Sequence, residues 1–355
     1  MELIKGILKD KFARWALIIL LLMYICIACA NFIAPYSKDF SDRNLSYAPP
    51  SPVYTITAEG HLSLPYTYNY VRVFDPDLYQ NVYKLDKTQK HYIKLFVKGD
   101  RYKILGLIPC SLHLFGTDDG GRLYLLGTDI NGRDVFSRLL FGGRISLTIG
   151  FLSLLILFPI GLLYGGISGY FGGWIDIIMM RFAEAVMAIP SFYLLIILAS
   201  ILPSNMTSTQ RFTLIVVILA LIGWAGFARV VRGMVLSIKN EEFVQAAETI
   251  GASKLRIIIK HILPQTSSYV IIAMTLSVPS YILSESGLSF LGLGIQQPDA
   301  SWGNMLKEAQ EYINILYRPW LLTPGLLIFI AVLCFNLIGD TVRDILDPKG
   351  RSRGK

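Results

Sequence analysis

The stretch EEFVQAAETIGASKLRIIIKHILPQ, residues 241–265, is polar and charged, yet it lies between two long apolar runs. Asn240 can cap a helix, and the two glutamates that follow place negative charge in the first turn, where the helix dipole favours it. Gly251 is positioned to end that helix in a left-handed cap. Ser253 can begin a second helix, which Pro264 would end. The pattern predicts a short helical hairpin between two apolar segments.

The two predicted helices differ in their faces. The first, of about 11 residues, is marginal alone in water and places Phe243, Ala246 or Ala247, and Ile250 at helical spacing. Its exposed face is expected to carry both alanines, which are small enough for close approach by another surface. An ordinary interfacial loop would show the same amphipathic pattern. The pattern alone therefore leaves open whether the first helix contacts another surface or belongs to such a loop. The second helix carries an apolar stripe able to lie against neighbouring helices: Leu255, Ile258, Ile259 and Ile262.

The rest of the chain is typical of a membrane protein. Of its 355 residues, 53% are hydrophobic and 16% are charged, which is too apolar for a soluble domain of this length. About 20 consecutive apolar residues cross a bilayer. We therefore expect a polytopic all-α membrane protein whose six spans lie at about 15–34, 145–171, 175–202, 212–235, 268–294 and 320–340.

The distribution of Lys and Arg predicts the orientation of these spans. Basic residues gather before the first span, in 229–260, and after the last span. With six spans these regions share one side, and the positive-inside rule makes that side the cytoplasm, together with both termini. The net charge of +8 thus reflects membrane topology rather than nucleic-acid binding.

Residues 35–125 differ in character from the apolar runs. They are rich in Pro and Tyr, and stretches such as HYIKLFVKGDRYKIL alternate as strands do. The aromatic content argues against a disordered loop. The expected parts are a cytoplasmic N-terminus with the first span (1–34), an external β-rich insert (35–125), a helical membrane part (126–345) with the hairpin (240–264), and a basic cytoplasmic tail (346–355).

Several residues suggest a metal or redox site, but a structural role explains them more simply. Asp129, Asn131 and Asp134 resemble a calcium loop that lacks the closing acidic ligand, so we expect tight turns there. Cys26 and Cys29 lie inside the first span and read as apolar filler. We expect no metal site and no cofactor bound by this chain.

The second span and the segment before it each show a distinct pattern. Residues 132–150 interleave three arginines with apolar residues and are expected to lie at the membrane interface before the second span. Within that span, Gly161, Gly165 and Gly169 recur every four residues, which favours close helix packing.

Ionisable residues inside the spans are few. Arg181 and Glu184 are three residues apart and can pair on one helix face, so either a structural pair or a gating role is open. Glu285 lies deeper, with Ser289 nearby, and should face protein or a water-filled cavity. It can serve a translocation path or gate, or an inter-helix hydrogen bond.

The sequence does not favour an enzyme. It contains no HExxH motif and no phosphate-binding loop, so it should not bind ATP in that way by itself. Ser289 in GLSF could act as a nucleophile only with a base in reach, and no His lies in a span. A proton-coupled carrier would show more ionisable groups and two matching halves.

The segment AAETIGASKLRIIIKHILP (246–264) resembles the EAA loop of ABC importer permeases, with the pattern Glu-Ala-Ala, three residues, Gly, nine residues, Ile, one residue, Leu-Pro. Counted from Gly251, Leu263 and Pro264 are in register. Gln245 stands where the pattern has Glu, and His261 where it has Ile. Three further segments resemble the C-type subunit of the dipeptide, oligopeptide and nickel branch, at 126–147, 284–306 and 339–349.

The resemblance implies a type I ABC importer fold and a permease subunit that forms half of a pathway for peptides or similar solutes. It implies a B-type permease as heterodimer partner, two ATP-binding subunits that use ATP and Mg, and an extracellular solute-binding protein. The EAA loop would dock an ATP-binding subunit, although Gln245 removes one charge there. The implied docking residues are Phe243, Gln245, Ala246, Ala247, Gly251, Ala252, Leu263 and Pro264.

The insert at 35–125 is not covered by the resemblance. A different hypothesis is therefore a membrane-anchored scaffold or sensor whose external part binds a ligand. Under that hypothesis the hairpin would be dispensable for uptake. Under the importer hypothesis, the residues expected to line or gate the path are Arg181, Glu184, Glu285 and Ser289.

Overall fold

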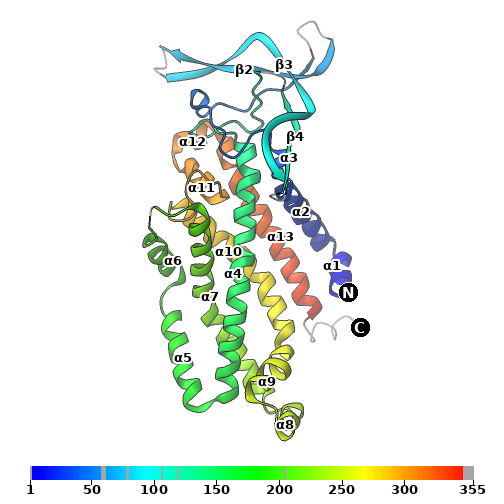
Figure 1. The fold of residues 1–355 in the computed structure, drawn as a ribbon, viewed down its shortest axis with the longest axis vertical. Coiled ribbons are helices and arrows are strands. Elements are labelled where there is room, and N and C mark those ends of the chain that lie inside the picture. Colours follow the sequence, from blue (N-terminus) through cyan, green and yellow to red (C-terminus); the bar gives the residue numbers. More distant parts are fainter. Residues whose placement is uncertain are drawn as a thin grey trace. The chain divides into compact units, whose positions relative to one another are not determined.

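The protein divides into two compact units in a computed structural model (Figure 1). The first unit comprises Met1–Leu20, Leu147–Gly294 and Ile328–Lys355, and the second comprises Leu21–Ser146 and Ile295–Leu327. The predicted tail at 346–355 lies outside the described residues from position 347 onward. The structure describes residues 2–56, 61–76, 80–104, 107–117, 120–203 and 205–346.

Long helices make up most of the first unit, as expected. Within the described residues, five helices are long and apolar enough to cross a membrane, or six when the bent pair α5 and α6 counts as one. The elements that lie in or enter this unit are α1 (Glu2–Lys9), α2 (Lys11–Ala28), α4 (Val135–Phe171), α5 (Gly173–Met187), α6 (Ser191–Ser200), α7 (Ser208–Ile238), α8 (Glu242–Thr249), α9 (Lys254–Ile257), α10 (Ser267–Phe290) and α13 (Thr323–Leu346).

Helices α4 and α7 pack through the predicted glycine face. A Cβ added at Gly161 would lie 2.5 Å from a ring carbon of Phe227, and one at Gly165 would lie 2.4 Å from a carbonyl oxygen of α7. At Gly169 the added atom would lie 2.8 Å from the carbonyl oxygen of Arg232. The three glycines therefore let the two helices approach more closely than any larger residue would allow.

The span predicted at 175–202 is not one straight helix. Two helices, α5 and α6, replace it, and they meet at a bend of 77°. Pro190 precedes α6 with ψ of 121°, so its backbone is extended. Proline lacks an N–H and disfavours helical backbone in the residue before it, which ends α5. The signal was present in the sequence, inside an otherwise apolar run.

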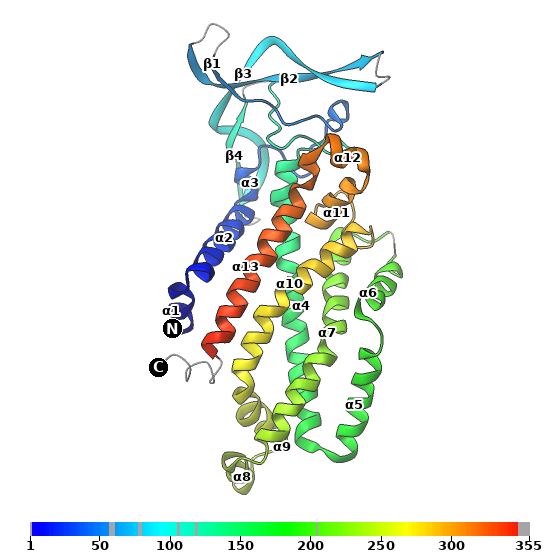
Figure 2. The same cartoon turned by 180° about the vertical axis from the view of Figure 1, so that it is seen from behind.

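A four-stranded antiparallel sheet dominates the second unit and confirms the predicted strand-rich insert. The strands pair in the order β1-β2-β3-β4, and Figure 2 shows β2 and β3 as a long hairpin. Tyr66 is buried, and its ring packs against Tyr54, Tyr68 and Tyr92, which gives the abundant tyrosines a role. The strands are β1 (Tyr54–Ile56), β2 (Leu62–Asp75), β3 (Gln80–Ile104) and β4 (Ile108–Thr117).

Short helices complete the second unit. Trp302 is buried at the start of one of them, where its indole N–H donates to the carbonyl oxygen of Leu139 at 3.0 Å. Arg144 donates to the carbonyl oxygens of Ile27 and Ala28 at the end of α2, where a positive charge suits the helix dipole. These helices are α3 (Ala30–Ile33), α11 (Trp302–Leu306), α12 (Tyr312–Tyr317), and 3-10 turns at Arg43–Leu45, Lys307–Gln310 and Pro319–Leu322.

Most of the segment 132–150 that was expected at the membrane interface, from Val135 onward, is the first part of α4, and Arg133 and Arg138 are buried. Asp129 accepts hydrogen bonds from the backbone N–H groups of Asn131 and Arg133, which is the predicted tight turn. Its other oxygen lies 2.6 Å from Nε of Arg133 and 3.3 Å from Nε of Arg138. The arginines therefore pair inside the protein rather than at a lipid surface.

Two carboxyl groups in the same region have raised pKa values. Burial raises the pKa of Asp134 to about 7, although Ser137 donates two hydrogen bonds to it. Burial, followed by the nearby charge of Asp129, raises the pKa of Glu308 to about 7. Desolvation thus outweighs the favourable contacts at both positions.

Candidate coupling loop and translocation residues

The hairpin at 240–264 is present and sits where α7 ends, as Figure 1 shows. Gly251 has φ of +77°, and its N–H donates to the carbonyl oxygen of Glu248 at 2.9 Å, so the predicted left-handed cap is confirmed. The first helix, α8, has 8 residues rather than about 11. Glu241 takes the capping position that was expected for Asn240.

The inner face of α8 packs onto α7. Val244 and Ala247 are buried at helical spacing, together with Val231 and Val235 of α7. The expectation of two outward alanines is half wrong, because Ala246 is exposed while Ala247 is 4% exposed. We call this set the hairpin core: Val231, Val235, Val244, Ala247, Ile257 and Ile262.

The second arm of the hairpin does not end at Pro264. Helix α9 runs into a π turn at Ile258–Ile262 and a 3-10 turn at Leu263–Thr266, which leads directly into α10. Pro264 stands in the first turn of the 3-10 segment, where a missing N–H is tolerated. The arm and α10 together form one 37-residue path, Lys254–Phe290.

The apolar stripe of this arm differs from the predicted one. Ile258 and Ile262 are buried as expected, but Leu255 and Ile259 are exposed, and Ile257 is buried in their stead. Leu255 and Ile257 lie in α9, before the π turn, so the packing of Ile257 into the hairpin core, and not the π turn, accounts for the change at these two positions.

Polar contacts tie the hairpin to the end of α4. The Tyr170 hydroxyl donates to Oε1 of Glu248 at 2.7 Å, and Nζ of Lys239 donates to the carbonyl oxygen of Gly169 at 3.2 Å. Nζ of Lys254 lies 5.3 Å from the ring centroid of Phe171. The hairpin therefore rests on both α4 and α7.

The outer face of α8 presents apolar side chains. Phe243, Ala246 and Ile250 follow the spacing of one helix face, and Phe243 is 40% exposed while Ile250 is 84% exposed. We call these three residues the hairpin tip. Apolar side chains gathered at one exposed site are typical of an interaction surface.

The remaining predicted docking residues divide between the two faces. Gln245 is exposed, and its side-chain amide donates to the carbonyl oxygen of Asn240 at 3.0 Å. Gly251 and Pro264 are also exposed. Ala252 and Leu263 are half-buried and pack against the hairpin core.

The four predicted pathway residues form two separate pairs. Glu285 is fully buried on α10, and the Ser289 hydroxyl donates to its Oε1 at 2.7 Å. Nη1 of Arg181 lies 3.0 Å from Oε2 of Glu184 on α5, which confirms the expected i,i+3 pair. The side chains of that second pair are 80% and 46% exposed.

One partly buried ion pair was not predicted from the sequence. Nε of Arg232 donates to Oδ1 of Asp176 at 2.9 Å, and its Nη2 contacts the other carboxylate oxygen. The Ser168 hydroxyl donates to the same Oδ1 at 2.5 Å. The group links α4, α5 and α7. Its members are too far apart in the chain for any spacing rule to pair them.

The family of the chain follows from comparison with known proteins. The family described as "Binding-protein-dependent transport system inner membrane component" matches residues 158–352, more than half of the chain. A second family, "N-terminal TM domain of oligopeptide transport permease C", matches residues 3–50. The chain therefore belongs to the binding-protein-dependent inner membrane transport components.

Relatives of the chain within this family are named as peptide permeases. The chain is 44% identical to the oligopeptide transport system permease protein OppC of Haemophilus influenzae, over 64% of this chain and 71% of that protein. It is 48% identical to the dipeptide transport system permease protein DppC of Bacillus subtilis, over 69% and 71%. A chain of the MetNI methionine ABC transporter aligns with 58% of this chain and 95% of its own length, with TM-score 0.45 and 18% identity.

Proposed function

We propose that the chain is the transmembrane permease subunit of an ATP-driven importer for di- or oligopeptides or similar solutes, and that it forms half of the translocation pathway. The observation that carries the proposal is the exposed hairpin tip on a base fixed by α4 and α7, in a chain of this family. The peptide class rests on the relatives, which are named as oligopeptide and dipeptide permeases.

The hairpin works as the coupling element in this proposal. An apolar tip next to neutral Gln245 suits a hydrophobic groove on a separate ATP-binding subunit better than a salt-bridged contact. Two such subunits would use ATP and Mg, so this chain would need no cofactor of its own and would not be an enzyme. A B-type permease would complete the pathway, and an extracellular solute-binding protein would deliver the substrate.

The two pairs of proposed pathway residues are supported by different observations. Glu285 and Ser289 are buried together on a helix that continues from the hairpin, so hairpin movement would reach them directly. An ionisable group at such a position is costly and typically serves a function. Arg181 and Glu184 pair on the surface of α5, where they can take part in a gate with the second permease.

ATP-dependent peptide accumulation in proteoliposomes tests the function. We expect this chain, with its partner permease, ATP-binding subunits and binding protein, to accumulate a radiolabelled dipeptide only when ATP is present inside. Replacement of residues 242–250 by a Gly-Ser linker should reduce accumulation to background. Uptake that persists with the linker would favour the scaffold or sensor hypothesis instead.

The proposal includes an orientation with both termini and the hairpin in the cytoplasm and the insert outside. The exposed residue Lys87 is a better position for a cysteine probe than its neighbour Asp86, because Asp86 accepts two hydrogen bonds from Thr88. In a chain whose four cysteines are replaced by Ser, we expect Lys87→Cys to react with a membrane-impermeant maleimide on intact cells. Gln245→Cys, the matched control, should react only after lysis. The reverse pattern would contradict the orientation.

A further inference from the structure

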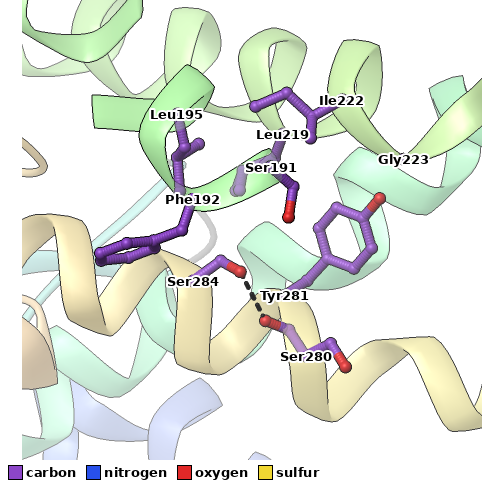
Figure 3. A pocket seen from close by; sticks show the side chains of 9 residues that line it. All are labelled: Ser191, Phe192, Leu195, Leu219, Ile222, Gly223, Ser280, Tyr281 and Ser284. Carbon is purple, nitrogen blue, oxygen red and sulfur yellow. Dashed lines mark hydrogen bonds between the residues drawn. The ribbon is translucent and has the colours of Figure 1, made fainter. Parts of the chain in front are cut away.

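The first unit contains a cavity of about 210 Å³ between α6, α7 and α10 (Figure 3). Figure 3 shows the Ser191 and Ser284 hydroxyls directed into the same space, with the Phe192 ring on one side and the Tyr281 ring on the other. Leu195 and Leu219 contribute apolar wall. The complete lining is Ser191, Phe192, Leu195, Leu219, Ile222, Gly223, Ser280, Tyr281 and Ser284.

The polar groups of the cavity are hydroxyls, and none of the 9 lining residues is charged. The Ser284 hydroxyl donates to the carbonyl oxygen of Ser280 at 2.8 Å, which leaves its own oxygen free to accept. The Tyr281 hydroxyl makes no hydrogen bond to any residue that the structure describes. The Tyr281 oxygen is not buried, so it can form a hydrogen bond with a group bound in the cavity.

Gly223 positions this hydroxyl. A Cβ added at Gly223 would lie 2.2 Å from the oxygen of Tyr281, so the ring fits against α7 only because position 223 has no side chain. The aromatic ring is thereby held at the wall of the cavity instead of filling it. The site is thus shaped by a specific close approach.

The volume of the cavity and the chemistry of its lining residues indicate which kind of ligand it can bind. Sites for whole small molecules occupy about 300–1,000 Å³, so this cavity holds only part of a larger ligand. A charged group would find no opposite charge among the lining residues. An uncharged amide offers both a donor and an acceptor to hydroxyls, and an apolar side chain suits Phe192 and Leu195.

We propose that this cavity binds an internal, uncharged residue of the transported peptide, with its peptide group at the Tyr281 and Ser284 hydroxyls and its side chain against Phe192 and Leu195. The inference rests on the proposed function and adds a substrate contact within this subunit. It predicts a preference for apolar over charged residues inside the peptide, independent of the binding protein's own selection.

Photolabelling of the assembled importer tests the site. The probe is a tripeptide with benzoylphenylalanine between two alanines, applied during ATP-driven uptake in proteoliposomes. Cross-links should map to the segments 191–195 and 280–284. Alanyl-leucyl-alanine in excess should suppress labelling by at least about fivefold, and alanyl-aspartyl-alanine should not.

Variants separate the hydroxyl from the cavity volume. Tyr281→Phe keeps the ring and should raise the KM for alanyl-leucyl-alanine uptake about fivefold, as expected for one lost hydrogen bond. Ser284→Leu fills the cavity and should reduce labelling about tenfold. Ser277→Leu is the matched control, because Ser277 lies about two turns earlier on α10 and also donates to the carbonyl oxygen four residues before it, but does not line the cavity.

The outcomes distinguish this inference from the proposed function. Uptake by the native importer with labelling outside the two segments, or with equal effects of Ser284→Leu and Ser277→Leu, would overturn the inference alone. Absence of ATP-driven peptide uptake by the native importer would overturn the proposed function and the inference with it.

Discussion

Replacement of both Phe243 and Ile250 by Asp should abolish ATP-driven uptake while the chain remains folded in the membrane. Both side chains point outward, so their loss costs the hairpin core nothing. Two carboxylates buried in an apolar docking groove would each lack a partner, which weakens binding by several kcal/mol. We expect the ATP-binding subunits no longer to co-purify with the permease in detergent.

Two contrasting changes serve as controls for this prediction. Ala247→Arg places a charge inside the hairpin core, so it should lower the thermal stability of the chain itself. Leu62→Asp with Leu64→Asp adds the same two charges at exposed apolar positions on β2, and should leave co-purification intact. Full co-purification of the Phe243 and Ile250 double variant would disprove the docking role of the hairpin tip.

Asp176→Ala should destabilise the protein more than any change to the exposed ion pair on the same helix. It leaves the guanidinium of Arg232 without its carboxylate, and loss of one partner of a fully buried pair costs about 3–5 kcal/mol. Because the Arg232 side chain is 33% exposed, solvent compensates in part, and we expect about 2 kcal/mol. Thermal unfolding of the purified chain in detergent measures the loss.

The double variant Asp176→Ala with Arg232→Ala should be more stable than the sum of the single losses predicts, because it leaves no unpaired charge. Arg181→Ala with Glu184→Ala is the matched control on α5, and its exposed pair should contribute less than about 1 kcal/mol. Equal losses for the two pairs, or simple additivity of the Asp176 and Arg232 variants, would show that the buried pair does not stabilise the fold.

The sequence predicted those features of the hairpin and membrane part that depend on local spacing. Gly251 ends α8 in a left-handed conformation, and the glycines of α4 receive α7, because both follow from backbone sterics. The strands of the insert followed from alternation. Their pairing order and register did not, since these depend on contacts between distant residues.

The sequence did not predict the features that depend on helix register or distant pairing. Leu255 and Ile259 of the predicted apolar stripe are exposed, whereas Ile257 packs in the hairpin core. Arg133 and Arg138 read as interfacial charges, but Asp129 pairs with both inside the protein. Of the candidate site, the cap and the surface pair were predictable, whereas the cavity at Tyr281 was not.

The second arm of the hairpin continues into α10 without a break, so a movement of the hairpin can be passed along α10 to the wall of the cavity. Between Leu255 and Ser284 the path is about 44 Å long at ~1.5 Å per residue. A tilt of about 5° at the hairpin end of a straight path of that length would displace Ser284 by about 4 Å. Pro279 and the π turn are two places where this path can bend, so stiffening either of them should change how much of a hairpin movement reaches Ser284.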